Sequence, residues 1–376
     1  MSNIRYSQEI DGLRAVAVLA VVFFHAGFGP GAGYVGVDIF FVISGYLITS
    51  LLHNEWSTTG RIDLTAFYAR RVKRILPAML VVIVATVTAS TLLLSPNGEV
   101  TEVARSAAAS LTFAANFFFQ ANTGGYFASA SDRMPLLHLW SLAVEEQFYL
   151  VWPIALLILM RWGRARTRSV LACVALASIS LAELLIFLGS NAAFYQMPAR
   201  LWELSAGGLI ALSPTSKLTG GGRSVALGMA ILALAIAIPI EHFPGLGALP
   251  AVVGTTAVLL GVHAAAGTGF AGSLLCTRPM TFIGRISYSL YTMALAVAGP
   301  CQCHACRPGV RGRSCRNLLR RRPPGNCDVQ AGRATVSATG LINIERKAGC
   351  CQFFRIVRLS SGNAAGGYRS LQSAIA

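Results

Sequence analysis

Arg14 and His25 lie within one strongly apolar run, and their types and spacing could do chemistry. They are 11 residues apart, almost three full turns of an α-helix, so both face the same way at roughly 16 Å along the axis. A histidine can take up a proton near neutral pH, as removal of a hydroxyl proton requires. An arginine is a bidentate ligand for phosphate. The pair predicts a polar stripe through one membrane span. The structural alternative is a snorkelling arginine and a histidine bonded by a neighbouring helix.

A second group lies in the segment 135–153, PLLHLWSLAVEEQFYLVWP. His138 and Glu145 are nearly two helical turns apart and share a face, whereas Glu146 points about 100° away. Two adjacent carboxylates in an apolar span could orient a histidine, accept a proton or bind a sugar hydroxyl. The alternative is an ion pair of these carboxylates with one of two arginines, Arg133 or Arg200.

Asp38 lies near the outer end of the second apolar run, in GYVGVDIFFVISGYL. It could cap a helix, or it could pair with His25 across a short turn. Further along the chain, Arg200 and Glu203 lie within one turn of each other and are candidates for a simple ion pair.

Arg71 and Arg74 lie in the basic stretch FYARRVKRILPA, just before the third apolar run. Their ordinary interpretation is a basic anchor at the cytoplasmic surface. The functional alternative is a clamp on an anionic ligand such as a coenzyme A phosphate.

The composition requires a membrane to position these residues. The chain is 54% hydrophobic and only 12% charged, whereas an ordinary soluble domain is about a quarter charged. This excludes a soluble globular enzyme, a disordered chain and a coiled coil, and predicts an all-α polytopic membrane helix bundle. Nine apolar runs approach the 20 residues that cross a bilayer: 10–28, 35–53, 75–95, 139–160, 169–189, 199–213, 224–240, 249–265 and 281–299.

Basic loops indicate the orientation, because short cytoplasmic loops are rich in Lys and Arg. The basic loops are 54–74, 161–168, 214–223 and 266–280. All four are cytoplasmic if the N-terminus is inside and the apolar run 104–120 does not span. We therefore expect 104–120 to be interfacial or re-entrant within a long external loop, 96–138. The first span carries Glu9 and Asp11 at its start and is expected to be retained, not cleaved as a signal peptide.

Taken together, four motifs resemble the acyltransferase-3 family of integral membrane acyltransferases, the O-antigen acetylase type. They are IDGLRAVAVLAVVFFH, GYVGVDIFFVISGYLI, FYARRVKRILPA and LLHLWSLAVEEQFYLVWP, and a later stretch, FIGRISYSLY, is also similar. Their order and spacing agree over residues 7–291, which makes the resemblance specific.

The resemblance implies a ten-span bundle that moves an acyl group, usually acetyl from acetyl-CoA, to a hydroxyl of a cell-envelope glycan. It assigns the essential arginine–histidine pair to Arg14 and His25, and the cytoplasmic arginine pair to Arg71 and Arg74. Glu145 and Glu146 match the glutamate region. Such members often carry an SGNH hydrolase-like domain at the C-terminus.

The sequence departs from the family after Tyr291. The family continues with Leu-Trp-His-Trp-Pro, and this chain with Thr-Met-Ala-Leu-Ala-Val. Permissive codons for these six residues, read from the second base, encode Leu-Trp-His-Trp-Pro. We therefore expect a membrane acyltransferase domain over 1–291 and, over 292–376, an out-of-frame, disordered tail. That tail holds seven of the nine Cys and most of the +16 net charge. Zinc binding by the tail is disfavoured, because its Cys spacing is irregular. Nucleic-acid binding by its Arg run 320–322 is disfavoured, because a frame-shifted GC-rich reading produces such residues without any function.

The predicted function is a membrane O-acyltransferase with an acyl-CoA donor, a cell-envelope glycan or glycolipid acceptor, and no permanently bound cofactor or metal. His25 would act as general base, oriented by Glu145 or Asp38, or would carry the acyl group itself. Beyond the two substrates, the expected partners are membrane lipid and no nucleic acid, and the expected location is the inner (cytoplasmic) membrane. The alternatives are an acyl-group exporter without its own chemistry and an inactive truncated product.

Overall fold

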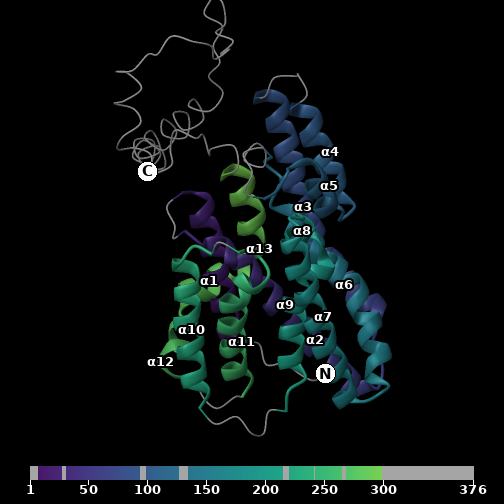
Figure 1. Ribbon diagram of the computed structural model, residues 1–376, viewed down its shortest axis with the longest axis vertical. Helices are drawn as coiled ribbons and strands as arrows, with labels where there is room; N and C mark the ends of the chain where they lie inside the picture. The colour runs from purple at the N-terminus through teal and green to yellow at the C-terminus, as the bar shows by residue number, and fades with distance from the viewer. Residues whose placement is uncertain are drawn as a thin grey trace, which may run out of the picture. The chain divides into compact units, whose positions relative to one another are not determined.

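The computed structural model describes residues 7–27, 31–93, 99–126, 134–214, 220–240, 242–264 and 268–298. All regular structure in these ranges is helical (Figure 1). The all-α membrane bundle expected from the composition is therefore confirmed.

Each of the nine apolar runs corresponds to one helix. These helices are α1 (Gln8–His25), α2 (Gly36–Thr59), α3 (Leu64–Leu93), α6 (Leu139–Met160), α7 (Arg164–Phe187), α9 (Met197–Ala211), α10 (Gly221–Ala237), α11 (Leu249–His263) and α13 (Arg278–Ala298). Shorter elements connect them: η1 (Gly33–Val35), α8 (Ala192–Tyr195), η4 (Leu246–Ala248) and α12 (Gly269–Leu275).

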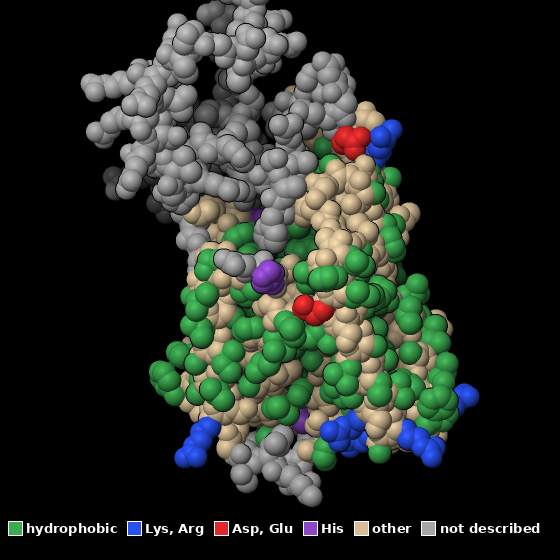
Figure 2. Space-filling model, viewed as in Figure 1, with side chains coloured by type: hydrophobic (Ala, Val, Ile, Leu, Met, Phe, Trp, Pro, Cys, Tyr) green, Lys and Arg blue, Asp and Glu red, His purple; other side chains and the backbone are tan. Residues whose placement is uncertain are grey.

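Five stretches of the described chain are long and apolar enough to cross a membrane: Gly33–Thr59, Leu64–Leu92, Leu139–Met160, Arg164–Phe187 and Leu246–His263. The helix α10 is apolar but shorter. Among the other expected spans, α1 begins with two acids and an arginine, and α9 has 15 residues. Figure 2 shows hydrophobic side chains over the middle of the visible face, with Lys and Arg gathered mainly at one end. This distribution is that of a multi-pass membrane protein.

The run 104–120 forms no single span. It is divided between α4 (Glu99–Leu111) and α5 (Ala115–Asn122), which a break at 112–114 separates. Helices of 13 and 8 residues rise about 20 and 12 Å, less than the roughly 30 Å of a hydrocarbon core.

The centre of the bundle is α2, which is buried along most of its length and packs against α9. Gly45 and Gly207 make this contact possible. A Cβ atom at Gly45 would collide with the carbonyl oxygen of Leu204, and one at Gly207 with that of Val42. The two backbones therefore touch directly, as small residues permit between membrane helices.

Tyrosine hydroxyls connect α3 to its neighbours. Tyr68 on α3 donates a hydrogen bond of 2.7 Å to the backbone carbonyl oxygen of Leu150 on α6. Tyr288 on α13 donates one of 3.0 Å to the carbonyl oxygen of Ile75 on α3. These bonds fix the part of α3 that carries the arginine pair.

The expected domain boundary after Tyr291 stays a prediction. The helix α13 continues without interruption from Arg278 to Ala298, so it crosses that position. The cysteine-rich part of the tail lies outside the described residues. Sequencing the gene across codons 280–310 would test the proposed change of frame.

Candidate functional site

A cleft opens between α1, α2, α3, α6 and α13. Helices that are far apart in the sequence each contribute polar groups to it. The charged and hydroxyl groups most relevant to chemistry are Arg14, Ser44, Arg71, Arg74, Glu145 and Tyr288. The cleft thus brings together Arg14, Arg71, Arg74 and Glu145, which the sequence singled out in three separate segments.

The arginine pair of the cleft lies within a helix, not in the loop before it. Because α3 begins at Leu64, Arg71 and Arg74 are seven and ten residues into the helix, roughly 10–15 Å from its first residue. A spacing of three residues puts both on one face. The guanidinium of Arg71 lies over the rings of Phe67 (5.6 Å) and Tyr149 (5.1 Å). The expectation of a loop over 54–74 is therefore wrong, because the polar first turns of α3 continue the apolar helix. That the pair lies at the cytoplasmic surface stays a prediction.

Glu145 is the carboxylate that lines this cleft. It accepts a hydrogen bond from the hydroxyl of Ser44 and interacts electrostatically with Arg14, Arg71 and Arg74. Glu146 is the next residue on α6 and does not line the cleft. One oxygen of Glu146, Oε1, is buried and has no hydrogen-bond partner among the described residues.

His25 lies outside this cleft, at the last turn of α1. Its Nδ1 is 2.8 Å from the carbonyl oxygen of Val21, and its Nε2 is 2.8 Å from the hydroxyl oxygen of Tyr126. Arg14 and His25 are therefore at two separate places along the same helix. The first belongs to the arginine-rich cleft, and the second to a site beside Tyr126.

Asp38 contacts Arg200 instead of His25. Its Oδ1 accepts a hydrogen bond of 2.7 Å from Arg200 Nη2, and α2 has no side-chain cap at its start. Glu203 Oε1 lies 3.0 Å from Arg200 Nη1, so the expected pair within α9 is confirmed. Both earlier interpretations of Asp38, as a cap and as a partner of His25, fail because Arg200 from a distant helix takes this carboxylate. The same pairing explains why Arg200 is not the partner of Glu145 or Glu146.

His138 is placed at the start of α6, beside the end of the cleft. Its ring lies edge-on to that of Tyr291 at 5.8 Å, and its buried Nε2 has no hydrogen-bond partner within the part of the chain that the structure describes. Tyr291 in turn shares a hydrogen bond of 2.7 Å with Ser141 and donates one to the carbonyl oxygen of His138. The motif FIGRISYSLY therefore closes the cleft against α6.

Sequence reasoning missed several hydroxyl groups. Tyr126 is the neighbour of His25, and Ser44 is the neighbour of Glu145. Ser44 and Tyr288 lie in two of the motifs that resemble the family, so the motifs pointed to these residues. Nothing in the sequence indicated what the two side chains contact. Tyr126 follows α5 in a polar segment, and nothing in its local pattern indicates that it returns to α1.

The described residues contain no group of three or more His, Cys, Asp or Glu side chains that could hold a metal ion. What they contain is a cleft with three guanidinium groups and one carboxylate, which suits a ligand with several negative charges. At a separate place they contain a histidine in contact with a hydroxyl, the arrangement that general-base chemistry needs.

Comparison with known proteins gives one family and several relatives. The model of an acyltransferase domain, of the acyltransferase-3 type, matches residues 7–299. A putative peptidoglycan O-acetyltransferase of Bacillus subtilis, YrhL, is 34% identical over 307 residues, covering 76% of this chain and 48% of the relative. No solved structure matches.

Two shorter matches have a higher sequence identity. The peptidoglycan O-acetyltransferase OatA of Listeria monocytogenes is 43% identical over 160 residues, 42% of this chain and 25% of the relative. A putative O-acetyltransferase of Staphylococcus aureus is 45% identical over 159 residues, 42% of this chain and 26% of the relative. The chain thus spans about half the length of the first of these relatives and about a quarter of the other two.

Proposed function

This chain belongs to the acyltransferase-3 family, and from that membership we propose that it is a membrane O-acetyltransferase. Its donor is a cytosolic acyl-CoA, with acetyl-CoA as the first candidate. Its acceptor is a hydroxyl of an extracytoplasmic cell-envelope glycan. Peptidoglycan is the first acceptor to test, because two of the relatives are named peptidoglycan O-acetyltransferases.

The observation that carries the proposal is the convergence of Arg14, Arg71 and Arg74 on one open cleft. The phosphate groups of a coenzyme A molecule need several cationic donors, and a guanidinium can bind a phosphate through two parallel hydrogen bonds. Arg71 and Arg74 would hold the nucleotide end of the donor. Arg14 and Glu145 lie on two other helices that line the same cleft and would orient the rest of the donor chain.

His25 supplies the base in this proposal. It removes the proton of an attacking hydroxyl, whose oxygen then forms a bond with the thioester carbonyl carbon while the carbon–sulfur bond breaks. The proton leaves with the coenzyme A thiol. In the resting structure the hydroxyl beside Nε2 is that of Tyr126. Tyr126 therefore either marks the position of the acceptor hydroxyl or is itself the first group to be acylated.

The orientation follows from the basic loops. Arg161 follows α6, and Arg164 and Arg166 lie in the first turn of α7. All three are exposed, and such short basic segments between spans face the cytoplasm. We propose that the chain lies in the cytoplasmic membrane with its N-terminus inside. The donor cleft is then reached from the cytosol, and His25 lies toward the outer end of α1.

The direct test is consumption of acetyl-CoA by the purified full chain in lipid nanodiscs, with no partner protein present. We expect wild type to release coenzyme A, and His25→Ala to lose at least about 100-fold in rate, the usual contribution of a general base. His53→Ala is the matched control, because His53 is half-buried on α2 and does not line the cleft. Unchanged release by His25→Ala would refute the role of His25. No release by wild type would favour an exporter or an inactive product.

A further inference from the structure

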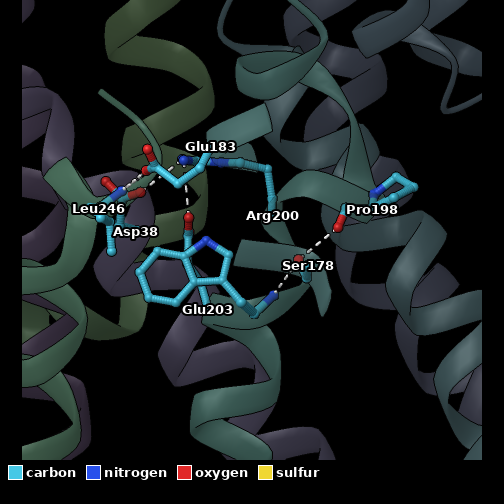
Figure 3. A network of polar contacts seen from close by, with 8 residues as sticks. Asp38, Ser178, Glu183, Pro198, Arg200, Glu203 and Leu246 are labelled. Atoms are coloured by element: carbon cyan, nitrogen blue, oxygen red, sulfur yellow. Dashed lines mark hydrogen bonds and ion pairs between the residues drawn. The ribbon is translucent and has the colours of Figure 1, made fainter. Parts of the chain in front are cut away.

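Arg200, Asp38 and Glu203 form a charge cluster that the proposed chemistry does not use. Arg200 and Glu203 are on α9, and Asp38 is in the first turn of α2. The guanidinium lies 2.7 Å from Asp38 and 3.0 Å from Glu203, and all three side chains have 0% exposure. Figure 3 shows Asp38 and Glu203 approaching the same end of the Arg200 side chain. None of the three lines the arginine-rich cleft.

Aromatic rings surround the guanidinium of this cluster. Arg200 Cζ lies 5.5 to 5.9 Å from the centres of four rings, those of Phe41, Trp140, Phe194 and Phe243. A cation over a ring face is attracted by the ring quadrupole, most strongly where water is excluded. The charge cluster therefore holds rings from several helices in fixed positions around one buried cation.

Two of these rings also hold Tyr126. Its ring stacks on Phe194 at 4.5 Å with an interplanar angle of 21° and lies edge-on to Trp140 at 6.2 Å. The hydroxyl of Tyr126 then reaches Nε2 of His25 at 2.8 Å. A continuous series of contacts thus runs from Arg200 through the rings of Phe194 and Trp140 to Tyr126 and His25.

We propose that Arg200, tied across to α2 by Asp38, is the positioning residue of the His25 site. It fixes the rings against which Tyr126 rests, and Tyr126 fixes the imidazole of His25. Arg200 touches neither substrate nor the reacting atoms. Its importance for catalysis rests on the proposed function, whereas its effect on the environment of His25 does not.

The proposal can be tested without an activity assay. Diethyl pyrocarbonate acylates the free nitrogens of histidine, and the hydrogen bond to Tyr126 protects Nε2 of His25. The full chain in nanodiscs is treated briefly, and the labelling of His25 relative to that of His53 is measured by peptide mass spectrometry. Tyr126→Phe removes the hydrogen bond to His25 and so gives the labelling rate expected for an unprotected Nε2. Losing one hydrogen bond of about 1 kcal/mol corresponds to about fivefold faster labelling.

Two variants interrupt the series at different points. Arg200→Lys keeps a positive charge beside the two buried carboxylates, so neither is left without a cation. It loses the planar guanidinium that pairs with Asp38 and Glu203 at the same time. Phe194→Leu leaves Arg200, Asp38 and Glu203 in place and removes the ring on which Tyr126 stacks, one of the two rings between the cluster and Tyr126. We expect both to label His25 about as fast as Tyr126→Phe. Ser178→Ala is the matched control: Ser178 bonds to Pro198 and Trp202 around the start of α9 without touching the rings.

If His25 is labelled at the wild-type rate in Arg200→Lys or in Phe194→Leu, the proposal is overturned, since the series of contacts needs both Arg200 and Phe194. Equally fast labelling in Ser178→Ala would overturn it too, because the effect would then be general loosening of α9. If wild type consumes acetyl-CoA, Arg200→Lys should lower kcat and leave the KM for acetyl-CoA unchanged. If wild type consumes none, the proposed function fails, and the labelling experiment still decides the positioning role.

Discussion

Three guanidinium groups and one carboxylate give the cleft an excess of positive charge. Glu145 faces Arg14, Arg71 and Arg74 and is itself held by Ser44. A carboxylate in this place keeps the arginines extended toward the cleft before a ligand arrives, since like charges on neighbouring helices otherwise repel. When an anionic ligand enters, it competes with Glu145 for the same donors.

We expect Arg71→Gln and Arg74→Gln each to raise the KM for acetyl-CoA about tenfold, since a hydrogen bond to a charged group contributes about 1.5–3 kcal/mol. Lys73→Gln is the matched control. Lys73 lies between the two arginines on α3, is exposed, and does not line the cleft. The measurement is the KM for coenzyme A release. An equal increase in Lys73→Gln would mean that only the overall positive charge of α3 matters.

Residue types and spacing could predict which side chains matter, but not which of them meet. Arg14, Arg71, Arg74 and Glu145 were all expected, and they converge because their helices pack together. The partner of Asp38 could not be predicted, because Arg200 is 162 residues away and no local pattern connects the two. A short-range pairing with His25 was the natural expectation from the sequence alone.

At the scale of elements, apolar runs located every long helix but not every end. The expected third span began at residue 75, whereas α3 begins at Leu64. Hydrophobicity reports where a helix meets lipid, and a helix can continue into polar surroundings because its backbone hydrogen bonds are internal. The division of 104–120 into α4 and α5 could also not be predicted from the pattern of apolar residues.

The glycine contacts between α2 and α9 give a prediction about stability. Gly45→Leu or Gly207→Leu would push apart two backbones that touch, and overpacking of this kind costs about 1–3 kcal/mol or more. We expect a lower thermal midpoint for the detergent-solubilised protein and less of it in the membrane. Ala177→Leu, at an exposed position on α7, is the control and should change neither. Wild-type thermal midpoints for both glycine variants would mean that the two helices do not touch there.

Hydrophobic side chains cover the middle of the visible face of the described chain, and its basic groups gather mainly at one end (Figure 2). Because the membrane is crossed several times, orientation decides which sites the cytosol can reach. The loop between α6 and α7 and the break between α4 and α5 should lie on opposite sides.

Orientation can be measured with single cysteines in a background in which the nine native cysteines are replaced by serine. Trp162→Cys places a thiol in the basic loop, and Thr112→Cys places one in the break between α4 and α5. We expect a membrane-impermeant maleimide to label Thr112→Cys in intact cells and Trp162→Cys only after permeabilisation. The reverse pattern would place the arginine-rich cleft and its donor on the wrong side.

The bonds that hold α3 also bear on how the sequence can vary. Tyr68 and Tyr288 bind backbone carbonyl oxygens, those of Leu150 and Ile75, and every amino acid carries such an oxygen. The residue at 150 can therefore change among apolar types to suit the surrounding lipid, and Leu150 is 61% exposed. In these two bonds, only the tyrosine hydroxyls depend on side-chain identity. Relatives in membranes of different composition could thus diverge along the outside of α3 and α6 while keeping these tyrosines.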